Sequence, residues 1–314
     1  MLARIAHELY WLGRNLTRAE FTARVVDGVF QLELQGQPEA AQGVTLGWSE
    51  LVTMLDTPHA GESDTSASAL HRLTLDPEAP GSIRSSIERA RDGARAVRDV
   101  ISAEMWEAIN TTALFLRGND TPEWLAPAGP HLACRYVKER VALVGGLSDR
   151  TMLRDEGKAF FAAGSEIEAS DMVLRMLRVA FRGGGDNNGG GPALALLQAV
   201  GGFQAFRRAV PAPPNAGPVG RFLLFERAYP DSVAASVDAL HESLLSADTS
   251  PRDSEPVLRL SRLAADLEFQ RRALPADAEI GATCEAVQAE LARVDQDISE
   301  RYFAGAGAPA TTVV

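Results

Sequence analysis

The chain has 314 residues, of which 46% are hydrophobic and 23% are charged, and its formal net charge is -11. A chain of this length can bury a large core, and its acidic balance argues against a general nucleic-acid-binding protein, which would carry a basic excess. The cysteines, Cys134 and Cys284, lie far apart and in no CxxC spacing, which favours free thiols in a reducing cytosol. We find no secretory signal and no apolar run long enough to span a membrane, and therefore expect a cytoplasmic protein.

Helical periodicity dominates the chain from its start. Apolar residues separated by three and four positions predict one long amphipathic helix in the first segment. They are Leu2, Ile5, Leu9, Leu12, Leu16, Ala19, Ala23, Val26 and Phe30. A second long helix is expected to begin after Ser82, its N-cap, and to continue to Ala108. A third is expected to begin near Thr151, which could cap it, and to run to Phe181.

The remaining pattern predicts an all-α, multi-helix bundle. Further helices are expected at 231–246, 253–272 and 276–303, with shorter ones at 47–57, 121–126 and 132–149, and 192–209 could be helical as well. Non-helical segments are expected at 57–69 (a surface loop), 183–191 (a flexible Gly-rich loop) and 304–314 (a disordered tail).

A stretch near the start is echoed about 150 residues later, which suggests an internal pseudo-repeat. GRNLTRAEFTARVV at 13–26 and GSEIEASDMVLRML at 164–177 align Gly13 with Gly164, Glu20 with Asp171 and Arg24 with Arg175. Each copy places a carboxylate on an apolar helical stripe, where burial is costly unless the charge is paired. We therefore predict one domain over 1–303, built of two related halves (about 1–149 and 150–303) that meet at a polar centre.

The first helix carries a set of charged candidates for that centre. Arg14 and Arg18 are four residues apart, as are Glu20 and Arg24, so each pair shares a face of the helix. An arginine partner would keep Glu20 charged. Two interpretations stay open: a salt-bridge lattice that fixes the register of the helices, and an anion or substrate pocket.

The second helix carries a basic stripe whose row contains one acid, Glu88. Its members are Arg84, Arg91, Arg95 and Arg98. This stripe favours binding of carboxylate or phosphate groups over a merely solvated face. Farther along, Glu104, Trp106 and Asn110 form a cluster in which Trp106 supplies a flat wall. For that cluster, ordinary helix packing with a polar edge is the favoured interpretation, and a binding site is the alternative.

Arg154 and Asp155 are candidates near the start of the third helix. The helix dipole is a sufficient local explanation for acids there, and a functional role would require these residues to face Glu20 and Asp171. The histidines and cysteines show no metal-ligand spacing, and the chain has neither a GxSxG elbow nor a P-loop. We therefore assign no metal and no cofactor.

Several segments resemble the Alpha-E family, a bacterial all-helical family named for its Glu-Arg motif. The similar segments are 8–24, 82–110, 151–161 and 298–303, and 82–110 is the most specific of them. The resemblance implies an association with circularly permuted ATP-grasp proteins and transglutaminase-like proteins in a peptide-forming or peptide-modifying system. It implies a partner in amide-bond chemistry rather than a defined reaction.

The chain departs from the pattern of the resembled family at the repeat. Thr17 stands where the first copy has a glutamate, and Ser165 and Ala169 stand where the second copy has arginines. Glu168 and Asp171 persist, so they would need counter-charges from elsewhere, for which the arginine row at 84–98 is a candidate. If the family has a working site, this chain carries a diverged or partly disabled version.

Three hypotheses follow for the function. The favoured one is a non-catalytic helical partner that docks on an ATP-grasp ligase and helps to hold its peptide or amino-acid substrate. A second is a purely structural helical scaffold. A third is an enzyme that uses Glu20 or Glu104 as acid–base, with Arg18, Arg84 and Arg91 as an anion clamp.

Overall fold

The computed structural model describes residues 1–34, 47–55, 66–118, 129–181 and 191–305. Within these residues the regular secondary structure is helical throughout, which confirms the predicted all-α bundle. The helices are α1 (Ala3–Leu34), α2 (Trp48–Leu55), α3 (Ser66–Thr74), α4 (Ile83–Ala96), α5 (Ala103–Gly118), α6 (Gly129–Thr151), α7 (Glu156–Ala180), α8 (Gly191–Ala199), α9 (Phe203–Ala209), α10 (Ala216–Phe225), α11 (Val233–Ala247), α12 (Glu255–Ala273) and α13 (Ile280–Tyr302), with short 3-10 turns at Pro251–Asp253 and Asp277–Glu279.

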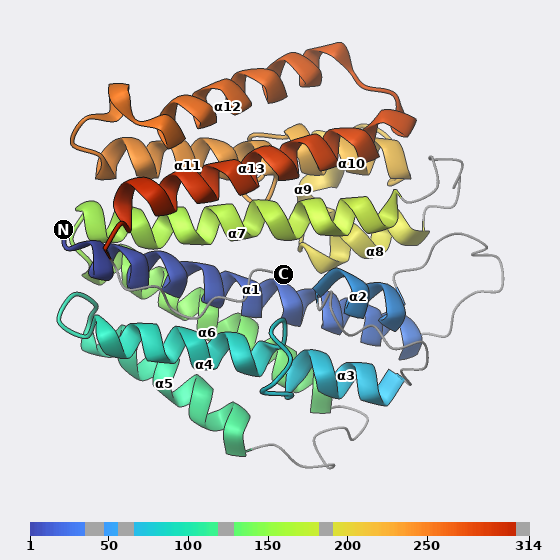
Figure 1. The fold of residues 1–314 in the computed structure, drawn as a ribbon. Coiled ribbons are helices and arrows are strands. Elements are labelled where there is room, and N and C mark those ends of the chain that lie inside the picture. Colours follow the sequence, from blue (N-terminus) through green and yellow to red (C-terminus); the bar gives the residue numbers. More distant parts are fainter. Residues whose placement is uncertain (35–46, 56–65, 119–128, 182–190, 306–314) are drawn as a thin grey trace.

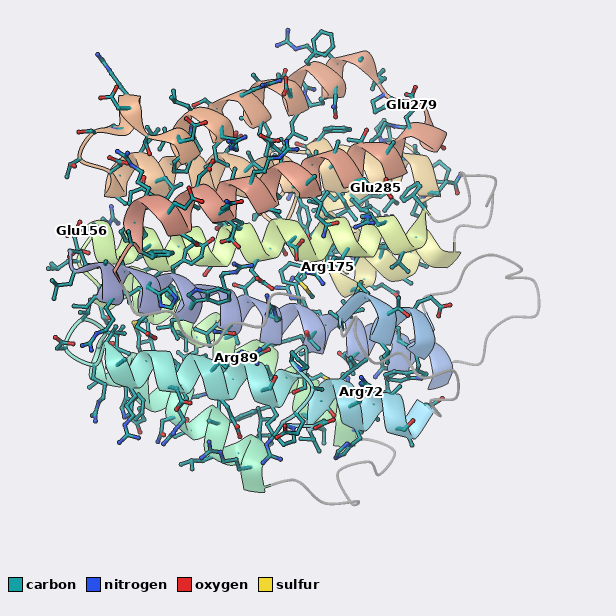
Figure 2. All side chains as sticks on the ribbon, viewed as in Figure 1. Arg72, Arg89, Glu156, Arg175, Glu279 and Glu285 are labelled. Carbon is teal, nitrogen blue, oxygen red and sulfur yellow. The ribbon has the colours of Figure 1, made fainter. Side chains whose placement is uncertain are left out.

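Helices α1 and α7 lie side by side through the middle of the molecule (Figure 1). The amino group of Met1 pairs with Glu156 at the start of α7 (Figure 2), so the two helices begin at the same end of the molecule and run in the same direction. Helices α4 and α6 pack on α1 and contact α5, whereas α11 and α13 pack on α7 and contact α12. The arrangement places the α1–α7 contact between two groups of helices. The internal repeat and the division into halves stay predictions.

The backbones of α1 and α7 approach each other at two glycines. A Cβ atom on Gly13 would overlap the carbonyl oxygen of Phe161, and a Cβ atom on Gly164 would overlap that of Tyr10. The contacts are reciprocal, since each glycine faces the residue three positions before the other. Only glycine permits a backbone approach this close.

The predicted second helix is confirmed at its start and wrong at its end. Ser82 accepts a hydrogen bond from the backbone N–H of Ser85 (3.0 Å), as an N-cap does. The segment is nevertheless two helices, because α4 ends at Ala96 and Ser102 caps a new helix, α5. Val97 and Ile101 in the turn are both buried. The apolar stripe therefore continues through the break, and periodicity alone does not reveal it.

The predicted start of the third helix near Thr151 is also wrong. Thr151 is the last residue of α6, and α7 begins five residues later at Glu156. The carboxylate of Asp155 caps α7, because it accepts hydrogen bonds from the backbone N–H groups of Gly157 (3.0 Å) and Lys158 (3.3 Å). Asp155 is thus the N-cap, a role that the sequence had given to Thr151.

Most of the other predicted helices are present. Helices α2, α6, α11, α12 and α13 coincide with or overlap the predicted segments, and 192–209 is divided between α8 and α9. Two helices were missed: α3, whose start lies in the predicted loop 57–69, and α10, whose sequence contains Gly217, Pro218 and Gly220. The predicted helix at 121–126 lies outside the described residues, as do nearly all of 183–191 and of the tail 304–314. Among the helices that the structure describes, none combines the length and the apolar character needed to cross a membrane.

Candidate functional site

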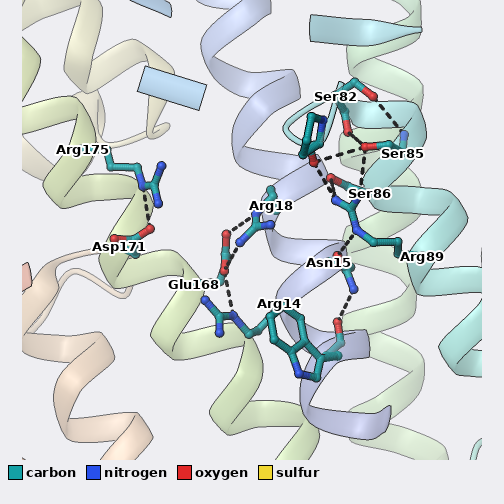
Figure 3. A network of polar contacts seen from close by, with 12 residues as sticks. Arg14, Asn15, Arg18, Ser82, Ser85, Ser86, Arg89, Glu168, Asp171 and Arg175 are labelled. Atoms are coloured by element: carbon teal, nitrogen blue, oxygen red, sulfur yellow. Dashed lines mark hydrogen bonds and ion pairs between the residues drawn. The ribbon is translucent and has the colours of Figure 1, made fainter. Parts of the chain in front are cut away.

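Glu168 lies at the centre of the α1–α7 contact. Its side chain is 1% exposed, and two arginines of α1 hold its carboxylate (Figure 3). Arg14 Nε donates to Oε2 (3.0 Å), while Arg18 donates from Nε to Oε1 (2.5 Å) and from Nη2 to Oε2 (2.9 Å). The bidentate geometry of Arg18 is the strongest form of an arginine–carboxylate pair.

Helix α13 adds a second carboxylate to this cluster. Asp295 accepts from Arg14 Nη1 (2.7 Å) and from the hydroxyl of Tyr10 (2.6 Å). The Arg14 guanidinium also lies 4.5 Å from the ring centroid of Trp11, within the range of a cation–π contact. Arg14 is thereby fixed by α1, α7 and α13 together.

The electrostatics of Glu168 favour the charged form. Burial opposes ionisation, but the charges and hydrogen bonds of Arg18 and Arg14 outweigh it and lower the pKa of Glu168 to about 2. Glu168 is therefore a permanent anion near neutral pH. It accepts hydrogen bonds and is unsuited to proton transfer.

Arg89 on α4 lies next to this cluster and has no carboxylate partner among the described residues. Its Nε donates to Asn15 Oδ1 (3.0 Å), its Nη1 to Ser85 Oγ (3.1 Å), and its Nη2 to the carbonyl of Pro80 (2.7 Å) and to Ser86 Oγ (3.2 Å). Although Arg89 as a residue is exposed, desolvation of its guanidinium and the nearby charge of Arg18 lower its pKa to about 10. All of its hydrogen-bond acceptors are neutral groups, so among the described residues no direct ion pair balances the positive charge of Arg89.

We refer to Arg14, Arg18, Arg89, Glu168 and Asp295 as the seam network. It contains three arginines and two carboxylates. An arrangement with a surplus guanidinium is suited to an anion. Arg18 and Asp295 keep 24% and 30% of their side-chain surface exposed, so the network is reachable from solvent.

Glu20 and Asp171 do not share this centre. Glu20 pairs with Arg24 (2.6 Å), which also donates to Asp231 (2.9 Å) and to the carbonyl of Val200 (3.0 Å). Glu20 and Asp171 are both partly buried, with 18% of each side chain exposed.

Asp171 has different partners from Glu20. It pairs with Arg175 (2.7 Å), accepts from Gln288 Nε2 (2.6 Å), and is linked through Arg175 to the carbonyl of Met54 (3.2 Å). The predicted meeting of Glu20 and Asp171 is therefore wrong, and Glu168 occupies the contact instead. Each arginine, Arg24 and Arg175, uses its remaining donors to hold a carbonyl near the end of a short helix, α8 or α2.

The predicted source of counter-charge for Glu168 is wrong as well. Glu168 is held by Arg14 and Arg18, and not by the predicted stripe, which comprises Arg84, Arg91 and Arg95 on α4 and Arg98 in the turn after it. The parallel packing of α1 and α7 brings Arg14 and Arg18 directly to Glu168. Arg84 pairs with Glu88 (3.2 Å), and Arg95 is exposed.

The cluster around Trp106 holds the other two arginines of the stripe. Arg91 Nε donates to Asn110 Oδ1 (2.8 Å), and Arg91 and Arg98 lie 5.8 and 4.8 Å from the Trp106 ring. These contacts join α4 to α5, which agrees with the packing interpretation. Glu104, in the first turn of α5, is exposed.

Arg154 and Asp155 lie at the end of the molecule where α7 begins. Arg154 is exposed, and Asp155 serves as the helix cap. Neither contacts Glu20 or Asp171, so the condition for a functional role is not met.

Three members of the seam network were not among the sequence candidates. Glu168 was noticed in the repeat but not chosen, although it is a carboxylate on a buried stripe. Arg89 falls outside the spacing of the α4 stripe. Asp295 is 281 residues from Arg14, and no local pattern links the two.

The buried cysteines are poorly suited to nucleophilic chemistry. Cys134 and Cys284 are free and buried, as expected, and burial raises the pKa of each thiol to about 12. Over the described part of the chain, no three His, Cys, Asp or Glu side chains are grouped so that they could hold a metal ion.

Glu166, also on α7, differs from Glu168 in its surroundings. Burial raises the pKa of Glu166 to about 7, and the charge of Asp231 acts in the same direction, whereas a hydrogen bond with Ser236 opposes it. Asp231 is itself paired with Arg24, which also pairs with Glu20. Arg24 therefore forms ion pairs with two carboxylates, and the carboxyl group of Glu166 lies near one of them.

This pKa predicts that stability falls between about pH 4.5 and pH 7. Because the folded-state pKa of Glu166 is raised from 4.5, its contribution is complete below 4.5 and is lost as the pH rises through 7. The loss is up to about 3 kcal/mol. Denaturant unfolding at pH 5 and pH 8 measures it, and Glu166→Gln is expected to remove the difference. Glu242→Gln, an equal charge change at an exposed site of α11, should retain it. An unchanged pH dependence in Glu166→Gln would show that Glu166 is not its source.

With the geometry established, the chain can be compared with known proteins. The model of a family described as a predicted alpha-helical domain with a conserved ER motif matches residues 1–303. The chain belongs to the Alpha-E family. The resemblance found in the sequence is thereby confirmed over nearly the whole chain.

Two mycobacterial proteins that carry no functional description are similar to this Alpha-E chain. It is 25% identical to the uncharacterized protein Mb2597 of Mycobacterium bovis and 24% identical to the uncharacterized protein Rv2567 of Mycobacterium tuberculosis. Each alignment covers 93% of the chain and 34% of the relative, so the chain spans about a third of the length of these proteins. No solved structure matches it.

Proposed function

We propose that this Alpha-E protein is a non-catalytic, substrate-handling partner of an ATP-grasp ligase in a system that forms or modifies amide bonds. The observation that supports it is the surplus of arginine in the seam network: three guanidiniums and two carboxylates, partly open to solvent. Such a network is suited to holding an anionic substrate.

The chemistry of the network favours holding over reacting. Both of its carboxylates accept hydrogen bonds from arginine, and the lowered pKa of Glu168 keeps that group ionised. A general acid or base would need a pKa closer to the working pH. An amide-forming ligase activates a carboxylate, so a partner that binds carboxylates would act by presenting the substrate. The transglutaminase-like protein is a second proposed partner, on the basis of the same resemblance.

Co-purification with an ATP-grasp protein encoded by a neighbouring gene tests the proposal. We expect a complex that survives gel filtration at micromolar concentration, and amide-bond formation by the ligase that depends on this chain. Arg18→Gln should reduce turnover without dissociating the complex, whereas Arg95→Gln, a charge change at an exposed position, should preserve both. The absence of a complex together with unchanged ligase activity would contradict the proposal.

A structural scaffold is the second candidate, and the near-complete burial of Glu168 between two arginines favours it. Buried ion pairs can often be replaced by apolar residues without loss of stability. If the combined replacement of Arg14, Arg18 and Glu168 by apolar residues leaves a folded protein that still supports the ligase, the network serves only the fold.

A further inference from the structure

Helix α12 carries apolar side chains on two opposite faces. Its inner face is buried and contains Val257, Leu260, Leu263 and Leu267. The helix lies at the edge of the bundle, where it packs on α11 and α13 (Figure 1). Its outer face holds Leu258 and Phe269, which are 51% and 75% exposed. A helix at the edge of a bundle usually turns a polar face to solvent, so this apolar outer face departs from the usual pattern.

The exposed positions of the outer face follow a heptad spacing. Five of them alternate at intervals of four and three residues, and we refer to them as the outer stripe: Leu258, Arg262, Ala265, Phe269 and Arg272. This is the spacing by which two helices pair side by side, each side chain fitting between those of the facing helix. Ala265 lies at the middle of the stripe, where a small side chain allows a second helix to approach closely.

A leucine of the neighbouring helix extends the apolar surface at one end of the stripe. The connection between α11 and α12 is short, so the two helices are antiparallel, and His241 Nε2 lies 2.9 Å from Ser261 Oγ. Leu245 lies one turn beyond His241 and is therefore beside Leu258. It is 42% exposed. Leu245 and Leu258 thus form a small apolar surface that Phe269 of another helix can cover.

We propose that the outer stripe is the interface of a symmetric dimer, in which α12 of a second copy of this chain packs antiparallel and Phe269 of each copy contacts Leu258 of the other. The contact is isologous, because each residue pair occurs twice about the two-fold axis. The inference goes beyond the proposed function and does not depend on it.

One antiparallel register brings the apolar residues together. In this register Leu258 meets Phe269 of the second copy, and Arg262 meets the small Ala265. A shift by one heptad in one direction would oppose Arg262 to Arg272, and in the other direction it would carry Phe269 past the start of α12. A parallel pair would place Arg262 against Arg262. The order of residues therefore selects a single arrangement of the two helices.

The charges of α12 are compatible with this contact. The chain has a net charge of -11, so two copies repel each other over most of their surfaces. Within α12, however, the arginines exceed the acids by one: Arg259, Arg262, Arg271 and Arg272 against Glu255, Asp266 and Glu268. Arg262 and Asp266 are 82% and 59% exposed and lie 3.7 Å apart on their own helix. The proposed register brings Arg262 of each copy beside Asp266 of the other, which adds two ion pairs across the axis.

Sedimentation velocity of the full chain over a concentration series tests the dimer. A contact of one helix per copy is small, so we expect a Kd in the micromolar range. Leu258→Ser and Phe269→Ser should each weaken association by about tenfold or more, because each lost contact occurs twice. Leu114→Ser is the matched control: it makes the same change on α5 at a leucine that is 52% exposed, and it should leave the Kd unchanged. Circular dichroism verifies that the variants are folded.

Cysteine cross-linking tests the register directly and leaves half of the apolar contacts in place. The Leu258→Cys and Phe269→Cys variants are prepared separately, mixed and oxidised. We expect a disulfide-linked dimer in the mixture and little or none in either variant alone, since an antiparallel pair separates identical positions. Cys134 and Cys284 are buried and should not contribute.

Four results would contradict the dimer. One is a chain that stays monomeric up to about 500 μM. Another is association that Leu258→Ser and Leu114→Ser weaken equally, or that neither affects. A third is a disulfide formed as readily by Leu258→Cys alone, which would indicate a parallel contact. The last is a monomeric chain whose outer stripe binds a helix of a different protein.

Discussion

Replacing Glu168 with glutamine is expected to lower the free energy of unfolding by about 3–5 kcal/mol. Glutamine has nearly the same shape but no charge, so Arg18 would lose its acidic partner and Arg14 would keep Asp295 alone. Removal of one member of a buried ion pair leaves the other charge desolvated and uncompensated. Urea unfolding at neutral pH measures the effect.

Asp171→Asn is the matched control for Glu168→Gln. It removes the same charge from the same helix, but Asp171 and Arg175 keep 18% and 34% of their side chains exposed. The expected loss is about 1 kcal/mol or less. Equal losses in the two variants would mean that burial of Glu168 in the seam carries no special energetic weight.

The pH dependence of the Glu168 contribution follows from its lowered pKa. Because the folded-state pKa of about 2 lies below the ordinary value of 4.5, its stabilisation is complete above 4.5 and is lost as the pH falls through 2. Glu168→Gln should therefore lose most relative to the unmodified protein at neutral pH and least near pH 2. Burial raises the pKa of both Glu166 and Glu168, which are two residues apart on α7. At Glu168 the two arginines outweigh burial, whereas at Glu166 the charge of Asp231 adds to it.

The bundle could be predicted because helical periodicity is a local property. The apolar stripe of α1 and the N-cap of α4 at Ser82 are each defined by residues that lie within a few positions of one another in the chain. Helix ends were predicted less well. Asp155 caps α7, whereas the sequence analysis placed the cap at Thr151. The buried Val97 and Ile101 continue the stripe across the break between α4 and α5.

The candidate site could be predicted only in part, since it depends on which face of α1 meets which face of α7. Arg14 and Arg18, two of the sequence candidates, lie at this contact and bind Glu168. The sequence analysis placed Glu20 and Asp171 at the shared centre, whereas each of them binds an arginine on its own helix. Arg89 and Asp295 enter from α4 and α13, and only tertiary packing brings them to the seam.

The close approach of α1 and α7 gives the second large expected effect. Gly164→Ala should destabilise the protein by about 3 kcal/mol, at the upper end of the usual cost of overpacking. The added Cβ would overlap the carbonyl oxygen of Tyr10, which belongs to a helix backbone and cannot rotate away. Gly146→Ala provides the contrast, because beyond its chain neighbours and the adjacent backbone of its own helix no atom lies within 4 Å of its Cβ position. That substitution replaces glycine inside α6 and should stabilise the protein by about 0.5–1 kcal/mol.

The side chains of the seam network should also respond to Gly164→Ala. If a Cβ at position 164 separates the helices, Arg14 and Arg18 move away from Glu168 together, and the ¹⁵N resonances of both side chains should shift. Gly13→Ala, which would overlap the carbonyl of Phe161, should give the same shifts because it separates the same pair of helices. The double variant should then cost less than the sum of the two single variants, since one displacement relieves both overlaps. Fully additive losses would instead mean that the two glycines act at independent contacts and that the seam does not move as a unit.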